Sequence, residues 1–124
     1  MPRVLVVEDE RPIRALISLA LREDGHQVEE AEDGEAAWER LQANPPDLLL
    51  LDLRLPRLSG VELLERLRQG GGLPCPVVVM TAYTLSPSDR AALDGLPLLR
   101  KPFDPEDLQR LVRAAVEGRR RTRR

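Results

Sequence analysis

Five side chains able to do chemistry stand directly after short, mostly apolar stretches of the sequence. They comprise three carboxylates, one hydroxyl and one ammonium. Oxygen-rich acidic groups suit a hard divalent cation, and a hydroxyl and an ammonium suit the oxygens of a phosphoryl group. This chemistry requires the fold to bring the five groups to one place. The residues are Glu8, Asp9, Asp52, Thr81 and Lys101.

The segment 47–60, DLLLLDLRLPRLSG, is the stretch around which the chain is organised. Four consecutive leucines without polar alternation indicate a strand that is covered on both faces, as in a parallel sheet between helix layers. Asp52 ends this strand, and Pro56 and Gly60 interrupt the chain after it. Ligands of open α/β sheets bind beyond the carboxyl ends of the strands. Taken alone, the segment equally allows Asp52 to bind a ligand or to cap the following loop.

Length and composition limit the class of protein. The 124 residues predict one domain, and a hydrophobic content of 42% with only 2% aromatics predicts an aliphatic core. No apolar run approaches the ~20 residues of a membrane span, and acids by position 8 argue against a signal peptide. The single cysteine, Cys75, excludes an internal disulfide and fits a reducing compartment, so we expect a cytoplasmic protein. With one histidine, His26, a zinc site of His and Cys is excluded.

Charge is distributed unevenly along the chain. Five arginines lie in residues 119–124, so residues 1–118 hold 19 − 5 = 14 basic against 21 acidic side chains, a net charge of −7. We expect residues 1–118 to form the domain and residues 119–124 to form a basic tail, disordered or the start of a linker. Lys101 is the only lysine among the 19 basic residues. Because the body is acidic, we expect nucleic acid to be bound only by an output domain outside this chain.

Hydrophobic periodicity predicts five strands alternating with five helices. Strands are expected at 4–7, 26–31, 48–51, 77–80 and 98–100, and helices at 11–24, 35–42, 61–69, 87–94 and 105–118. Such alternation predicts an α/β, flavodoxin-like, doubly wound five-stranded parallel sheet in the order 2-1-3-4-5, with helices on both faces. Strands one and three are neighbours in that order, so the acids that end them converge. Thr81 and Lys101 end strands four and five at the same edge.

Clustered carboxylates repel one another, and a divalent cation relieves the repulsion. Ligands that are all oxygen favour Mg²⁺, which binds one or two carboxylates and keeps waters or phosphate oxygens. Lys101 adds a movable positive charge and Thr81 a hydroxyl donor. A carboxylate in these surroundings is equipped to accept a phosphoryl group and to stabilise it.

Four motifs in this order resemble those of a response-regulator receiver domain of two-component signal transduction, of the chemotaxis-regulator type, over residues 3–117. The motifs are VLVVEDE (4–10), LLLLDLRLPRLSG (48–60), VVVMTAY (77–83) and RKPF (100–103). The resemblance implies that Asp52 accepts the phosphoryl group. It implies that Asp9 binds Mg²⁺ directly, Glu8 binds it through water, and the Arg54 main-chain carbonyl completes the protein ligands.

The resemblance also implies roles for the groups opposite the metal. Thr81 would bond a phosphoryl oxygen in the active state, and Lys101 would pair with the acyl phosphate, with a cis bond to Pro102. Arg54 and Tyr83 lie at positions that tune water's access, although a merely exposed aromatic at 83 is an equal alternative. Leu98 departs from the family, which usually has Tyr or Phe there. With leucine at position 98, no aromatic ring is available to couple the movement of Thr81 to the switch.

We therefore expect a phospho-accepting signalling switch and not a metabolic enzyme. Its partners would be a histidine kinase or phosphotransfer protein, and an output domain or protein at the face of the fourth helix, fifth strand and fifth helix. The alternatives are a small flavin or nucleotide carrier and a partner-binding pseudo-receiver. The acidic EDERP after the first strand argues against the carrier, because it would repel phosphate unless a metal intervened. The intact set of Asp52, Thr81 and Lys101 argues against the pseudo-receiver.

Overall fold

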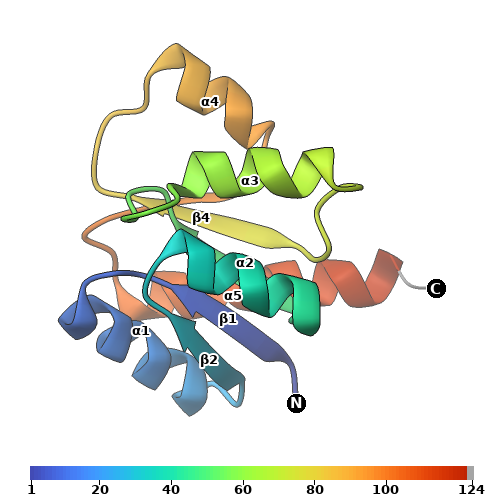
Figure 1. Cartoon of the computed structure of the whole chain (residues 1–124). Helices are drawn as coiled ribbons and strands as arrows, with labels where there is room; N and C mark the ends of the chain where they lie inside the picture. Colours follow the sequence, from blue (N-terminus) through green and yellow to red (C-terminus); the bar gives the residue numbers. More distant parts are fainter. Residues whose placement is uncertain (123–124) are drawn as a thin grey trace.

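The computed structural model describes residues 1–122, and strands and helices alternate throughout them (Figure 1). All neighbouring strands pair in parallel, in the order β2-β1-β3-β4-β5. This is the order predicted from the sequence, and it confirms the doubly wound fold. The strands are β1 (Arg3–Val7), β2 (Gln27–Ala31), β3 (Leu48–Asp52), β4 (Val77–Thr81) and β5 (Leu98–Arg100). The helices are α1 (Arg11–Glu23), α2 (Gly34–Ala43), α3 (Gly60–Gln69), α4 (Pro87–Leu93) and α5 (Pro105–Thr122).

Helices cover both faces of the sheet, and successive strand residues alternate between two aliphatic cores. Val4 and Val6 face a core shared with α1 and α5. Leu5 and Val7 face the core on the other side, shared with α2, α3 and α4. Every residue of β3 and β4 is buried, because helices lie on both of their faces. The unbroken leucine and valine runs in the sequence follow from this double burial.

Side-chain caps determine where several helices begin. Asp33 accepts a hydrogen bond from the Ala36 amide at 2.8 Å at the start of α2. Ser59 and Glu62 form a reciprocal capping box at the start of α3. Ser86 caps α4 with Pro87 as the first helical residue, as the sequence predicted. The caps of α3 and α4 fix the ends of the loops that leave β3 and β4.

Helix α5 extends further than predicted. The hydrophobic periodicity predicted an end at Gly118, but α5 continues to Thr122. Arginine is a good helix former, so the basic run does not stop the helix. Of the tail predicted at residues 119–124 as disordered or a linker, residues 123–124 lie outside the described part of the chain.

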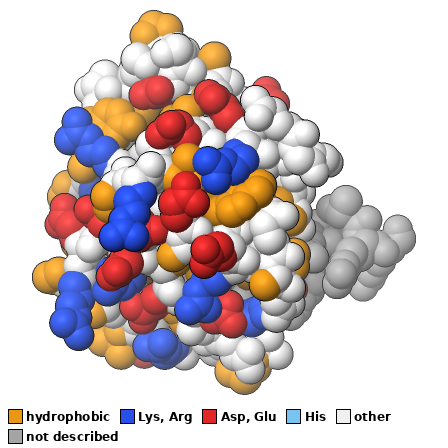
Figure 2. Space-filling model, in the orientation of Figure 1, with side chains coloured by type: hydrophobic (Ala, Val, Ile, Leu, Met, Phe, Trp, Pro, Cys, Tyr) orange, Lys and Arg blue, Asp and Glu red, His pale blue; other side chains and the backbone are white. Residues whose placement is uncertain are grey.

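Two surface properties bear on partners. Acidic and basic side chains are interspersed across the face drawn in Figure 2. Mixed charge of this kind does not favour binding of a phosphate backbone by this face. Among the described residues, no helix combines the length and apolar character needed to cross a membrane.

Candidate functional site

The strand register brings the predicted residues to one edge of the sheet. Val7 lies opposite Leu51, and Thr81 lies opposite Arg100. The residues that follow Val7, Leu51 and Arg100 therefore emerge at the same carboxyl edge of the sheet. These next residues are Glu8, Asp52 and Lys101.

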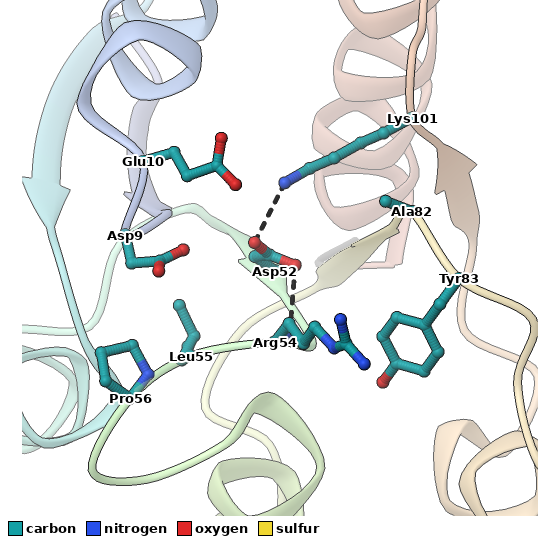
Figure 3. A pocket seen from close by; sticks show the side chains of 9 residues that line it. All are labelled: Asp9, Glu10, Asp52, Arg54, Leu55, Pro56, Ala82, Tyr83 and Lys101. Carbon is teal, nitrogen blue, oxygen red and sulfur yellow. Dashed lines mark hydrogen bonds and ion pairs between the residues drawn. The ribbon is translucent and has the colours of Figure 1, made fainter.

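Lys101 joins two of the acidic residues. Its Nζ lies 3.0 Å from Asp52 Oδ2, and it also donates a hydrogen bond to Glu8 Oε1 (Figure 3 draws the Asp52 pair). The backbone N–H of Lys101 donates to the Thr81 carbonyl at 2.8 Å, which anchors the start of this loop to β4. The Lys101–Pro102 peptide is cis, as the resemblance implied. The ammonium thus bonds to the acidic residues that follow β1 and end β3.

Three carboxylates cluster at this edge of the sheet. One oxygen each from Glu8, Asp9 and Asp52 lie within 4.8 Å of one another. Glu8 and Asp52 are buried, whereas Asp9 is exposed. With all three ionised, the formal charge of the cluster with Lys101 is −3 + 1 = −2. An all-oxygen set of this charge fits a hard divalent cation such as Mg²⁺.

Burial perturbs the protonation of this cluster. Burial, opposed by the hydrogen bond from Lys101 and reinforced by the charge of Asp52, raises the pKa of Glu8 to about 7. Burial by itself would lower the pKa of Lys101, but its hydrogen bonds to Glu8 and Asp52 outweigh that effect and raise it. Lys101 therefore carries its charge at neutral pH, and Glu8 gives up its proton less readily than an exposed glutamate does.

A pocket of about 350 Å³ opens in front of Asp52 (Figure 3). The Arg54 backbone N–H donates to Asp52 Oδ1 at 3.1 Å and orients the carboxylate. The Arg54 guanidinium carbon lies 4.9 Å from the centre of the Tyr83 ring, so both predicted tuning residues form one wall. The lining residues are Asp9, Glu10, Asp52, Arg54, Leu55, Pro56, Ala82, Tyr83 and Lys101.

Thr81 ends β4 as predicted, but its hydroxyl is engaged elsewhere. The Thr81 Oγ1 accepts a hydrogen bond from the Tyr83 N–H at 3.2 Å and donates to the Tyr83 carbonyl at 3.3 Å. The side chain is fully buried and does not line the pocket in front of Asp52. A hydrogen bond from Thr81 to a group on Asp52 therefore requires this local turn to open.

Leu98 packs where the resembled family usually carries an aromatic ring. It is half-buried against the core formed with α2, α3 and α4. Its partner across the sheet is Val79. This position is on the same side of the sheet as α4, so movement of α4 changes the surroundings of Leu98.

Gly60 has a packing role that was not predicted from the sequence. A Cβ at this position would lie 2.6 Å from the carbonyl oxygen of Asp52 and 2.7 Å from the Cα of Leu53. The Gly60 N–H donates to the Leu53 carbonyl at 3.0 Å. Only glycine permits this approach, which holds the start of α3 against the end of β3. Its position directly after a serine cap was the available signal.

Comparisons with known proteins agree with this geometry. Residues 4–113 match the response regulator receiver domain family. The chain is 38% identical to the response regulator MprA of Mycobacterium tuberculosis over 119 residues, which cover 92% of this chain and 50% of MprA. It is 37% identical over 120 residues to the phosphate regulon transcriptional regulatory protein PhoB of Escherichia coli, covering 92% of this chain and 51% of PhoB. The chain spans about half the length of these relatives.

Solved structures give the same assignment. The receiver domain of the Francisella response regulator 1452 superposes with a TM-score of 0.86 at 28% identity, covering 95% of this chain and 98% of that one. A CheY-like receiver domain protein from Methanospirillum hungatei superposes with a TM-score of 0.87 at 25% identity, with 98% of each chain covered. The doubly wound sheet, the acidic pocket at its carboxyl edge and these relatives together identify the class of protein. It is a phospho-accepting signalling switch. The chain belongs to the response regulator receiver domain family, and a flavin carrier or pseudo-receiver is not favoured.

Proposed function

We propose that Asp52 is the residue that accepts the phosphoryl group, and that phosphorylation changes the face formed by α4, β5 and α5. The observation that carries this proposal is the position of Lys101. Its ammonium lies 3.0 Å from Asp52 Oδ2 while Arg54 N–H donates to Asp52 Oδ1 at 3.1 Å. Both carboxylate oxygens are therefore held in a defined orientation toward an open pocket.

In the proposed transfer, one carboxylate oxygen of Asp52 attacks the phosphorus of a phosphohistidine. A P–O bond to Asp52 forms as the P–N bond breaks, and the imidazole leaves. Lys101 stays within reach and balances the charge on the phosphoryl oxygens. Thr81 exchanges its bonds to the Tyr83 backbone for a bond to a phosphoryl oxygen. Hydrolysis later returns Asp52 to a carboxylate when water attacks the phosphorus.

The proposed cofactor is Mg²⁺, held by Asp9 and Asp52, by Glu8 through water and by the Arg54 main-chain carbonyl. When bound, Mg²⁺ neutralises the charge that accumulates on the transferring oxygens. Glu8, Asp9 and Asp52 support this assignment by their proximity and their all-oxygen donors. Glu8 also accepts a hydrogen bond from Lys101, so the same residue would position both the ammonium and the cation.

The donor is proposed to be a histidine kinase or a phosphotransfer protein in the cytoplasm. The receiver is proposed to occupy residues 1–118, with the basic residues that follow leading out of it. The chemistry is confined to self-phosphorylation and self-dephosphorylation, so we do not propose a metabolic enzyme. The output is proposed to be a domain or protein bound at the α4–β5–α5 face, and any nucleic acid would bind through that output.

The test is chemical labelling. Acetyl phosphate with Mg²⁺ should phosphorylate the wild type, and borohydride reduction before peptide mapping should locate the label at Asp52. Asp52→Asn should remain unlabelled. Glu65→Gln, which alters an exposed acid on α3, serves as the matched control and should be labelled like the wild type. Undiminished labelling of Asp52→Asn would contradict the proposal.

A further inference from the structure

Arg14 connects α1 to the backbone of the acidic loop. Its Nη1 donates a hydrogen bond of 2.9 Å to the main-chain carbonyl of Glu8. Its Nε donates a second bond of 2.9 Å to Glu30 Oε1 on β2. The Arg14 side chain is only 13% exposed and Glu8 is buried, so the bond to the Glu8 carbonyl is shielded from competing water. One guanidinium thus bridges α1, β2 and the loop that follows β1.

Glu30 pairs with Arg14 and is itself held in place by a hydrogen bond. Its second oxygen, Oε2, accepts a hydrogen bond of 3.0 Å from the hydroxyl of Ser18, which is buried. Arg22 lies at 3.8 Å from the same oxygen, but its side chain is 56% exposed. The carboxylate of Glu30 balances the charge of Arg14. The guanidinium is therefore engaged by Glu30 and does not compete with a cation for Glu8, Asp9 and Asp52.

The Arg14 bond completes a set of restraints on the loop. The Glu8 N–H donates to the Ala31 carbonyl at 3.1 Å, and the Glu10 N–H donates to Glu8 Oε2 at 3.2 Å. With the Glu8 carbonyl held by Arg14, the peptide that leads into Asp9 has a defined orientation. Asp9 itself is exposed, so the backbone on either side of it must set the direction of its carboxylate.

We propose that Arg14 is a positioning residue for the metal site: it holds the Glu8–Asp9 peptide so that the Asp9 carboxylate points at the cluster, and Glu30 orients Arg14 in turn. This inference rests on the proposed function of the acidic cluster. It assigns the arginine an effect on Mg²⁺ affinity without direct contact with the ion. Hydrogen-bond partners of metal ligands act in this way in other metal sites.

The experiment is a Mg²⁺ titration of the whole chain, followed by the amide signals of residues 8–10. Arg14→Met removes both donors at similar length and should weaken Mg²⁺ binding about tenfold. Arg22→Met is the matched control, because Arg22 is also an α1 arginine paired with Glu30 but makes no bond to the loop. It should bind Mg²⁺ like the wild type. Equal affinities for all three proteins would overturn the inference.

A purely structural role would lower the melting temperature of Arg14→Met and leave the Mg²⁺ affinity of the folded protein unchanged. Glu30→Gln covers the case in which Arg14→Met does not fold. It retains Arg14 but loosens its orientation, so a smaller loss of Mg²⁺ affinity supports the inference, and no loss overturns it. A wild type that binds no Mg²⁺ contradicts the proposed function itself, and the inference with it.

Discussion

The guanidinium of Arg54 stacks on the ring of Tyr83, with 4.9 Å between the guanidinium carbon and the ring centre. The two residues come from the loops after β3 and β4, and both line the pocket in front of Asp52. A cation–π contact at an exposed site is worth about 0.5–1 kcal/mol. That is enough to favour the stacked arrangement but not to lock it. We therefore expect the pair to act as a partial screen between the pocket and bulk water.

We predict that Tyr83→Ala shortens the lifetime of the acyl phosphate on Asp52, because water reaches the phosphorus more easily. Losing a contact of ~1 kcal/mol corresponds to a roughly fivefold faster decay of the acyl phosphate. The decay of the isolated phosphoprotein measures it. Arg66 lies 5.2 Å from the Trp38 ring, a similar stack that lies outside the pocket, so Arg66→Ala is the control. A decay rate unchanged in Tyr83→Ala would show that the stack does not screen the site.

The second prediction concerns metal binding. Mg²⁺ should shift the amide signals of residues 8–10 and 52–54, and Asp9→Asn should abolish the shifts because it removes the exposed carboxylate of the cluster. Glu23→Gln, at the far end of α1, should titrate like the wild type. If the wild-type amides around the cluster do not respond to Mg²⁺, the metal assignment is wrong.

The third prediction concerns pH. Burial raises the pKa of Glu8 from 4.5 to about 7, so the folded state binds this proton more tightly than the unfolded chain does. The contribution of Glu8 to the free energy of unfolding, without metal, therefore falls as pH rises from 4.5 to about 7. The full change is on the order of 3 kcal/mol. The raised pKa of Lys101 affects the free energy of unfolding only at higher pH, outside this window.

Urea unfolding in the presence of a chelator, at pH values on both sides of this window, measures the effect. Glu8→Gln cannot ionise, so its stability should lose this component of the pH dependence and exceed that of the wild type above the window. Identical pH profiles for the two proteins would show that Glu8 does not carry the perturbed proton.

The fourth prediction concerns the switch. In α4 only Leu93 is buried, and Arg68 of α3 donates hydrogen bonds to the carbonyls of Ala92 and Leu93 at the end of that helix. With little apolar contact, α4 can rearrange at low cost. Beryllofluoride, a stable mimic of the phosphoryl group, should change hydrogen exchange mainly within residues 82–98. Changes confined to α1 and α2 would contradict this account.

Arg68→Met should increase hydrogen exchange in α4 before beryllofluoride is added, because two carbonyls at the helix end lose their donor. The difference on adding beryllofluoride should then be smaller. Gln69→Ala changes an exposed neighbour on α3 and is the control. If the exchange of α4 in Arg68→Met matches the wild type, Arg68 does not restrain the helix.

Much of this protein can be predicted from local sequence patterns. Apolar runs mark strands that are buried on both faces, so the alternation of strands and helices and the order of the sheet follow from the sequence. The residue directly after each run lies at the carboxyl edge. For that reason Asp52, Thr81 and Lys101 could be assigned to one site before any contact was known.

Only the tertiary structure decided which atoms meet. Lys101 bonds both Glu8 and Asp52, Thr81 turns its hydroxyl to the Tyr83 backbone, and Arg14 reaches the Glu8 carbonyl. In the sequence Arg14 is one of three arginines on an amphipathic helix, and no local pattern distinguishes it. A strand buried on both faces has apolar side chains at consecutive positions, so its burial can be predicted from the sequence. A single hydrogen bond between distant segments depends on register, helix placement and side-chain rotamer together, which are set when the chain packs.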